Sequence, residues 1–599
     1  MNTILTAITL LGGLAMFLYG MEIMGDGLKQ SSGTALKNFL GKLTNNVVMG
    51  VLTGTIVTAI IQSSTATIVL TVGLIGAGIL TLRQGVSIVM GANIGTTATA
   101  QIIRLMDIES SGNSILAFFK PDTLAPVALV IGIILTMFIK KGAFKNVGMI
   151  CLGFGVLFTG LMAMTDAVEP LADSQLFIDA LSYFSNMPVL GILTGLVLTV
   201  IVQSSSAMVG ILQALSSTGL MTFNLVYPII MGINLGTCVT TAMVCSIGSS
   251  KDAKRTGVVH IVFNTIGTLL FMIVMSVLRS AGFFGGLWSS VVDSGVIANF
   301  QTLFNLLTAI VLIPFTNQLV NIACRLVKDD PEEEDKYPEL AALDEKLMIS
   351  PAVALGEVER TLTVMARAAK ENVELSLQQL KKYDPKVTAT INRYEERLDE
   401  FADKADNYLI QLSRHIETEW DNRNLNVLMQ CVPDVERIGD YATNFDEMAL
   451  KLYESGLEFS GSAREELDIL GEAVMEILRL TVEALETDSD QVARRIEPLE
   501  EVIDDMVLLL KNRHTDRLCR GVCAIDTGLV FQDLLTHLER TADQCSSIAM
   551  MLMSKRNEEI LKAHHHYIHE LHATADQSYL AEDKMRRAQF LTPLEKIVG

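Results

Sequence analysis

The sequence predicts an all-α protein, in which a polytopic membrane part precedes a soluble helical part. Three observations predict this fold class. The first 325 or so residues consist of long apolar stretches with short polar breaks, and 50% of all 599 residues are hydrophobic, with a mean hydropathy of +0.39. A block of 51 residues within that part occurs twice. Beyond residue 340, charged and apolar residues recur with helical spacing, and no long alternating strand pattern is found.

The charge is divided unequally between the two parts. Residues 1–328 contain 15 Lys and Arg against 11 Asp and Glu, whereas residues 329–599 contain 31 against 56. The acidic second part therefore disfavours nucleic acid as a partner. Eight scattered cysteines form no CxxC pair, which favours reduced, structural thiols. No Walker loop, GxSxG or HExxH motif occurs, so we expect no enzymatic activity.

The membrane part is an internal duplication. Residues 50–100 align without a gap to residues 191–241, with 20 of the 51 positions identical. The identical pairs include Gly54/Gly195, Gln62/Gln203, Gly78/Gly219, Gly91/Gly232, Asn93/Asn234, Gly95/Gly236 and Thr96/Thr237. A weaker echo pairs Gly13 with Gly153 and Gly20 with Gly160. Duplicated membrane segments with matching polar and glycine breaks are typical of transporters, with the site at the repeat interface.

The predicted elements follow in order. Residues 4–24 are long enough to cross a bilayer, and residues 27–45 predict an interfacial helix. A polar break divides 47–79 into two pieces, each short for a crossing, so we predict a re-entrant hairpin with the break at its tip. Further spans are expected at 85–104 and 122–139. The second repeat predicts a span at 146–165, a hairpin at 188–219, spans at 226–247 and 256–279, and then an unpaired span at 300–323.

The distribution of basic residues predicts the orientation. Three crossings per repeat make the two repeats, about 4–140 and 146–279, inverted with respect to each other. If the C-terminal part is cytoplasmic, twelve Lys and Arg lie in inside loops and three, Arg104, Lys120 and Arg279, lie outside. This asymmetry agrees with the positive-inside rule. We therefore expect a multi-pass protein of the plasma (inner) membrane with its N-terminus outside.

The soluble part is predicted to be built from helices alone. Domain boundaries are expected at 1–325 for the membrane domain and at 326–350 for an acidic linker that contains DDPEEEDKYPEL. Six amphipathic stretches in 351–553 fit two tandem three-helix bundles, and 554–599 is expected to be a helical tail.

The hairpin tips supply the chemistry of the membrane part. Each tip is a run of small polar residues within an apolar stretch, where polar groups usually mark a substrate or ion path. Hydroxyl and amide oxygens suit sodium, and helix N-termini suit an anion. Together they indicate a sodium-coupled anion carrier. Serine and threonine also serve helix packing in membranes, an alternative that the duplication disfavours. The two tips are Gln62, Ser63, Ser64, Thr65 and Gln203, Ser204, Ser205, Ser206.

These motifs, with GANIGTT (91–97) and GINLGTC (232–238), resemble the type II sodium–phosphate cotransporter family. HIVFNTIGT (260–268) and FQTLFN (300–305) resemble the later spans of that family. The resemblance implies two inverted repeats that bind phosphate and sodium between their hairpin tips. It implies that the eight tip residues form the site and that four further residues line it, Asn93, Thr96, Asn234 and Thr237. Arg83 matches a family arginine, and a positive-inside anchor is an equal alternative for it.

Two acidic motifs in the soluble part share one spacing. Glu436/Asp440 and Glu539/Asp543 each lie four residues apart, on one helix face. Two such faces could share a divalent or ferric ion, and solvated helix surfaces are the alternative. Residues 350–553 resemble the PhoU family, which implies metal at these four residues. The histidines at 564–566, 569 and 572 are better explained as an exposed helix face than as a metal site.

The sequence therefore predicts a sodium-coupled inorganic phosphate symporter with alternating access and a cytoplasmic regulatory domain. A membrane phosphate sensor, and a sodium-coupled carrier or exporter of another oxyanion, are the alternatives. Phosphate, sodium and the lipid bilayer are the expected partners. Stoichiometry, direction of transport, regulatory signal and any homo-oligomer are left open.

Overall fold

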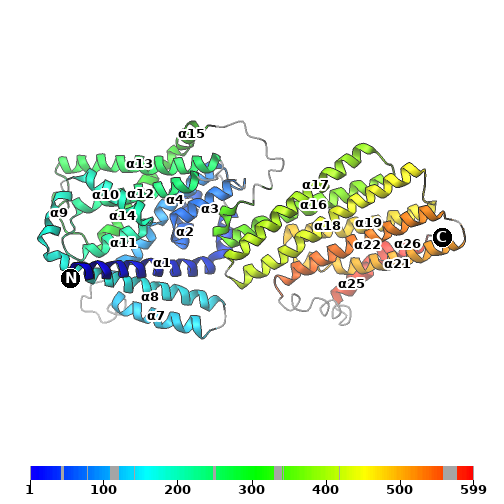
Figure 1. The fold of residues 1–599 in the computed structure, drawn as a ribbon, viewed down its shortest axis with the longest axis horizontal. Helices are drawn as coiled ribbons and strands as arrows, with labels where there is room; N and C mark the ends of the chain where they lie inside the picture. The colour runs from blue at the N-terminus through cyan, green and yellow to red at the C-terminus, as the bar shows by residue number, and fades with distance from the viewer. Residues whose placement is uncertain are drawn as a thin grey trace. The chain divides into compact units, whose positions relative to one another are not determined.

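The computed structural model describes residues 2–41, 46–76, 78–107, 120–139, 142–185, 187–246, 251–328, 340, 343–416, 418–521, 523–557 and 577–597. Within these ranges every regular element is a helix, apart from one isolated bridge between Thr222 and Val291. The helices fall into two compact units (Figure 1). The first unit contains residues 1–336 and 344–353, and the second contains 337–343 and 354–599.

The first unit contains both repeats. The first repeat comprises α1 (Asn2–Gly41), α2 (Val47–Ile61), α3 (Ser64–Gly76), α4 (Leu82–Gly95), α5 (Thr97–Ile103) and α7 (Pro121–Met137). The second comprises α8 (Gly142–Val168), α9 (Gln175–Ser185), α10 (Pro188–Val202), α11 (Ser205–Ser216), α12 (Phe223–Ser246) and α13 (Lys251–Ser280). The last span is α14 (Ser294–Leu312) with α15 (Thr316–Leu326).

The two predicted hairpins are present as pairs of short helices. The four helices α2, α3, α10 and α11 have 15, 13, 15 and 12 residues. At 1.5 Å per residue, none reaches the roughly 30 Å of a hydrocarbon core. Six other helices are long and apolar enough to cross a membrane. They are Leu5–Ser31, Leu82–Ile103, Phe144–Val168, Phe223–Met243, Lys251–Ser280 and Ser294–Leu326.

Outward faces of these helices carry exposed apolar side chains. On α13, for example, Leu269, Ile273 and Val277 are each more than half exposed. Such a continuous apolar surface on a helix is costly in water but is matched to lipid. The first unit is therefore a multi-pass membrane domain.

Helices α1 and α8 pack through reciprocal glycine contacts. A Cβ atom built on Gly13 would lie 2.8 Å from the Gly160 carbonyl oxygen, and one built on Gly160 would lie 2.6 Å from the Gly13 oxygen. Gly20 and Gly153 approach each other in the same way. Since Gly13 corresponds to Gly153 and Gly20 to Gly160, exchanging the repeats reproduces the contacts. The pairing runs antiparallel, as in repeats of inverted topology.

The hairpins rest on the following helices through the duplicated glycines. A Cβ on Gly54 would lie 2.1 Å from the Ile88 oxygen, and one on Gly195 would lie 2.2 Å from the Ile229 oxygen. Gly91 and Gly232 make the reverse contacts, at 2.0 Å and 2.1 Å. These distances leave no room for a side chain, so α2 packs against α4 backbone to backbone, and α10 packs against α12 in the same manner.

Some elements differ from the sequence-based expectation. The predicted interfacial helix at 27–45 is, as far as Gly41, a continuation of α1. Helix α9, which had not been expected, precedes the second hairpin, and the last span extends to Leu326. Residues Glu345–Ile349, expected within the linker, form the short 3₁₀ helix η5. Leu347 of η5 is fully buried against Gly73 of α3.

The second unit is a helical array whose six long helices are α16 (Pro351–Gln379), α17 (Pro385–Leu412), α18 (Glu419–Ser455), α19 (Gly461–Thr487), α21 (Ile496–Cys519) and α22 (Ile525–Ser554). The short α20 (Asp490–Ala493) precedes α21. The C-terminal elements α25 (Gln577–Arg586), η7 (Arg587–Leu591) and α26 (Thr592–Glu595) pack on it. There, the buried Arg586 bonds Glu476 at 3.0 Å, and Arg513 donates to the Leu594 carbonyl at 3.0 Å. This part of the expected tail is therefore docked on the array.

Candidate functional site

The two hairpin tips have the same backbone conformation. Gln62 ends α2 with φ 59° and ψ 16°, and Gln203 ends α10 with φ 57° and ψ 19°. Each amide N–H still donates to a threonine carbonyl four residues earlier, Thr58 or Thr199, at 2.7 Å. A left-handed, non-glycine residue is costly and is found mainly where function or tight packing requires it. The two duplicated glutamines thus have nearly the same φ and ψ angles.

One residue on, Ser63 and Ser204 cap the second helix of each hairpin. The Ser63 hydroxyl accepts a hydrogen bond from the Ala66 N–H, and the Ser204 hydroxyl accepts one from the Ala207 N–H, both at 3.2 Å. Such a cap satisfies one of the free amides of a helix N-terminus. The amides of the first two residues after each cap have no acceptor within the helix. They belong to Ser64, Thr65, Ser205 and Ser206.

The two tips line one shared cavity that is open to solvent. All eight predicted tip residues border it, together with Thr199, Thr237 and Thr240. None of these lining side chains is ionisable, so its polarity comes from hydroxyls, amides and peptide groups. Since positive ends of two helix dipoles meet there, the cavity suits an anion accompanied by a cation that oxygen atoms can bind.

The surroundings of the two glutamines differ. The Gln62 side chain donates to the Ala59 carbonyl at 2.5 Å and accepts from the Thr99 hydroxyl at 2.7 Å. The Gln203 side chain is exposed, and it makes no hydrogen bond to the residues that the structure describes. The first tip is therefore held in place by the protein, whereas the second glutamine is available to a ligand.

Of the four further residues that the resemblance implied, one lines the cavity and three do not. Thr237 lines the cavity. Asn93 and Asn234 are buried, and the Asn93 Oδ1 atom lies 3.2 Å from Nε2 of His260. The Thr96 hydroxyl donates to the Ala92 carbonyl at 3.0 Å. None of these three is among the cavity-lining residues. Asn93 and Thr96 lie on α4 and at its end, and Asn234 lies on α12, the two helices on which α2 and α10 pack.

Arg83 is exposed in the first turn of α4. It precedes Asn93 by ten residues, or about 15 Å along the helix. The structure therefore does not bring Arg83 to the cavity, and its position agrees with the alternative role of a charged anchor at a helix end.

Sequence reasoning missed Thr199 and Thr240. Both belong to identical pairs of the duplication, Thr58/Thr199 and Thr99/Thr240, and this was the signal that could have found them. Thr58 itself is fully buried and donates to the Thr67 hydroxyl at 3.0 Å. The position equivalent to Thr67 in the second repeat is Met208, which offers no such partner. Among the described residues, the Thr199 hydroxyl donates to the Gly195 carbonyl of its own helix, and Thr199 contributes to the cavity wall.

In the second unit, the first acidic motif faces the preceding helix. Burial raises the pKa of Glu436, and the charges of Asp440, Asp399, Asp406 and Asp403 raise it further. The last three carboxylates lie on α17, and the motif lies on α18. This group is the first acidic cluster.

Carboxyl groups beside the second acidic motif also have raised pKa values, and they lie on α21. Glu500 and Asp504 of α21 have ligand oxygens within 4.8 Å of each other and of Asp543. Burial and then the charges of Glu497 and Asp504 raise the pKa of Glu500 to about 9. Burial, followed by Asp543 and Glu539, raises the pKa of Asp504 to about 7. Glu539 itself forms an ion pair with Lys511 at 2.7 Å. We name Glu500, Asp504 and Asp543 the second acidic cluster.

The two motifs are therefore placed in separate clusters, one in each bundle, and not on two faces of a single ion site. Where α18 and α22 meet, the Ser547 hydroxyl donates to Asp434 at 2.6 Å, and the rings of Tyr441 and Phe445 pack against His537. The same i, i+4 spacing in Glu500/Asp504 and Asp399/Asp403 was the signal that could have identified the partner helices. The five C-terminal histidines between 564 and 572 lie outside the described residues.

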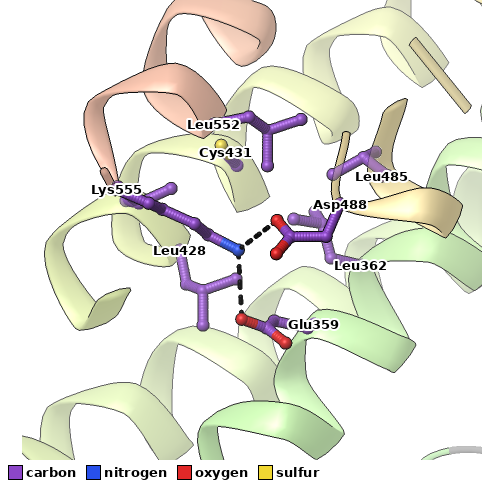
Figure 2. Close-up of a pocket in the computed structure, with 9 residues that line it drawn as sticks. Glu359, Leu362, Leu428, Cys431, Leu485, Asp488, Leu552 and Lys555 are labelled. Carbon is purple, nitrogen blue, oxygen red and sulfur yellow. Dashed lines mark hydrogen bonds and ion pairs between the residues drawn. The ribbon is translucent and has the colours of Figure 1, made fainter. Parts of the chain in front are cut away.

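The second unit also contains a cavity, which surrounds Lys555 (Figure 2). The Lys555 Nζ atom lies 3.0 Å from Glu359 and 3.3 Å from Asp488, and the lysine is 4% exposed. Burial lowers the pKa of Lys555, but the two carboxylates outweigh this effect and hold the pKa above its usual value. Leu362, Leu428 and other apolar side chains form the walls. With two carboxylates to one lysine, this cavity disfavours an anion and serves to join α16, the end of α19 and α22.

Comparison with known proteins agrees with the division into two units. Residues 16–166 and 160–288 match the family model of the Na+/Pi-cotransporter, and residues 362–448 and 467–552 match that of the PhoU domain. The chain joins a Na+/Pi-cotransporter region to a PhoU region. Each model matches twice, in agreement with the internal repeats.

The individual relatives are distant in sequence, and the share of this chain that they match differs widely. The "Putative inorganic phosphate export protein YjbB" of Escherichia coli K12 is 22% identical over 561 residues, which cover 93% of this chain and 99% of that protein. The human "Sodium-dependent phosphate transport protein 2B" is 32% identical over 103 residues, or 17% of this chain and 15% of that protein. The crystal structure of PhoU from Streptococcus pneumoniae covers 35% of this chain and 97% of its own, with 20% identity and a TM-score of 0.32.

Proposed function

We propose that this protein transports inorganic phosphate in symport with sodium, by alternating access to the cavity between the two hairpin tips. The observation that carries the proposal is that both Gln-Ser-Ser tips, 141 residues apart in the sequence, line a single uncharged polar cavity. Phosphate would accept hydrogen bonds from the free amides and hydroxyls of the two helix N-termini. Sodium ions would supply the positive charge that the cavity wall lacks.

The pseudo-symmetry supports alternating access. In inverted repeats, one hairpin can adopt the packing of the other, and exchanging them reverses the side from which the site is open. The glycine contacts of α2 on α4 and of α10 on α12 are nearly equal, at 2.0–2.2 Å. Each hairpin thus packs on a helix through glycines, and a contact without side chains would let the hairpin slide.

The orientation in the membrane belongs to the same proposal. The excess of Lys and Arg in alternate loops supports a PhoU region in the cytoplasm and an N-terminus outside. Export is a second candidate for the direction of phosphate movement, because YjbB, which matches nearly the whole chain, is named as a phosphate export protein. The sign of the net flux depends on the gradients and does not change the site.

The PhoU region would regulate transport through η5. Leu347 packs on Gly73 of α3, the second helix of the first hairpin. Four residues later the chain enters α16 at Pro351, the first helix of the PhoU region. A movement of α16 would therefore be passed to the hairpin over only a few residues. Metal bound at the acidic clusters, where raised pKa values report closely spaced carboxylates, is the proposed input to this movement.

The experiment is uptake of labelled phosphate by proteoliposomes containing the purified protein. Phosphate accumulation that requires an inward sodium gradient, and that potassium or choline cannot replace, supports symport. Sodium-independent exchange of phosphate would instead indicate a carrier without coupling. Phosphate binding without any flux would favour the sensor alternative.

A further inference from the structure

Helices α13 and α14 bury a set of polar side chains away from the hairpin cavity. Five of these residues are at most 2% exposed, and the sixth, Thr268, is 4% exposed. They lie at helical spacing on two membrane-spanning segments. Polar groups in such an environment are costly unless they find partners. The six are His260, Asn264 and Thr268 of α13, and Gln301, Asn305 and Thr308 of α14.

Part of this set is satisfied within the protein. His260 contacts Asn93, and the Asn264 amide donates to the His260 carbonyl at 3.0 Å. The Asn305 amide donates to the Gln301 carbonyl, also at 3.0 Å. Four side-chain oxygens, however, are buried with no hydrogen-bond partner among the described residues. These oxygens are Thr268 Oγ1, Gln301 Oε1, Asn305 Oδ1 and Thr308 Oγ1, and the Nδ1 atom of His260 is likewise buried without a partner among the described residues.

The register of the two helices places three of these residues, Thr268, Asn305 and Thr308, at about one level. Phe271 packs edge-to-face against Phe304 with ring centroids 4.8 Å apart, and a Cβ on Gly267 would lie 2.5 Å from the Thr308 methyl group. These contacts define an antiparallel pairing, in which Thr268 lies level with the turn that contains Asn305 and Thr308. Gln301 lies one turn before Asn305 on α14. The absence of a side chain at Gly267 lets the helices approach closely there.

The chemistry of the four unpartnered oxygens selects the ligand. All four are neutral oxygens of hydroxyl or amide groups, which are the donors that a hard cation prefers. No carboxylate belongs to the set, which disfavours a divalent ion, and no thiol belongs to it, which disfavours a soft metal.

We infer that α13 and α14 form a sodium-binding site, separate from the hairpin cavity, with Thr268, Asn305 and Thr308 as ligands and Gln301 adjacent. Its coupling to transport rests on the proposed function, whereas binding of the cation does not. None of the four residues lines the hairpin cavity. Asn93, which lies 3.2 Å from His260, belongs to α4, the helix that follows the first hairpin.

The test uses the purified full-length protein in detergent. Thermal unfolding is followed while sodium chloride replaces choline chloride at constant ionic strength. Thr268→Val and Thr308→Val are each expected to raise the sodium concentration for half-maximal stabilisation by about tenfold or more. Without sodium, both variants should be at least as stable as the wild type, because valine removes a buried hydroxyl that has no partner.

Matched controls are available on neighbouring segments. Thr256 of α13 and Thr316 of α15 are equally buried, but their hydroxyls donate to carbonyls of Asp252 and Ile313, each at 2.7 Å. Thr256→Val and Thr316→Val should leave the sodium titration unchanged. Sodium stabilisation that is the same in the wild type, the test variants and the controls would overturn the site, and would leave the four oxygens hydrated by buried water.

Phosphate uptake separates this inference from the proposed function. If sodium drives uptake in the wild type, and the test variants need about tenfold more sodium but keep their phosphate half-saturation at saturating sodium, the site is supported as a coupling site. If sodium drives uptake equally well in wild type and variants, the inference fails and the proposed function stands. If no sodium-driven uptake occurs but the stabilisation still depends on Thr268 and Thr308, the cation site stands and the proposed function fails.

Discussion

The hydroxyls of Ser64 and Ser205 should serve the ligand, whereas those of Ser63 and Ser204 should serve the fold. Ser64 is 6% exposed and Ser205 is 9% exposed, and neither hydroxyl bonds any residue that the structure describes. Ser64→Ala and Ser205→Ala therefore remove one bond to phosphate or sodium each. A hydrogen bond to a charged group contributes about 1.5–3 kcal/mol, so apparent phosphate affinity should fall by a factor of about 10 to 150.

The capping serines provide the comparison. Ser63→Ala and Ser204→Ala lose the bond to the N–H of Ala66 or Ala207, which should reduce stability by about 1 kcal/mol. Uptake as a function of phosphate concentration and thermal unfolding should both be measured on all four variants. Ser280→Ala, whose hydroxyl donates to Ser276 at the exposed end of α13, controls for the mutation itself. If Ser64→Ala or Ser205→Ala transports with wild-type affinity, the two tips do not form one site.

Four further outcomes are expected. Asp440→Ala and Asp543→Ala in the full-length protein should each lower the amount of bound divalent or ferric metal; equal metal in the variants and the wild type would leave these carboxylates as surface charges. In metal-free protein, Glu500 binds a proton when folded up to a pKa of about 9 but only to about 4.5 when unfolded, so the stability of the PhoU region should fall as the pH rises between these values; a flat profile would contradict that clustering. Lys555→Met should destabilise the PhoU region by about 2 kcal/mol, since it removes the buried cation from between Glu359 and Asp488, of which Asp488 keeps an ion pair with Arg556, and denaturant unfolding measures this change. Truncation after Lys328 should preserve sodium-driven phosphate flux but change its rate or its response to phosphate or metal, and Leu347→Asp should reproduce the change by undocking η5; loss of all flux in a normally inserted truncation would make the PhoU region part of the transport machinery.

The hairpins were predictable because their signal is local. A polar tetrapeptide in an apolar stretch too long for one span and too short for two leaves few arrangements of the backbone. The duplication then implied that the tips are equivalent, and the matched dihedral angles of Gln62 and Gln203 agree with that. The glycines Gly54 and Gly91 were identified as duplicated, but their function is contact with a neighbouring backbone, which only the packed structure reveals.

Other features depend on contacts between segments distant in the sequence. Thr199 and Thr58 occupy equivalent positions, yet only Thr199 lines the cavity, because the partner of Thr58 is replaced by a methionine in the second repeat. The acidic motifs on α18 and α22 predicted clusters of carboxylates, but which helix faces each motif depends on bundle packing. The docking of Leu347 on Gly73 follows a linker whose composition gave no sign of it.

Sodium-driven accumulation of labelled phosphate, measured in proteoliposomes with the wild type and with Ser64→Ala and Ser205→Ala, tests the central claim most directly. The account predicts accumulation in the wild type that collapses when the sodium gradient is abolished, and a large loss of accumulation at low phosphate in each variant. Accumulation that persists without sodium, or that survives unchanged in either variant, would contradict a sodium-coupled phosphate site made by both hairpin tips.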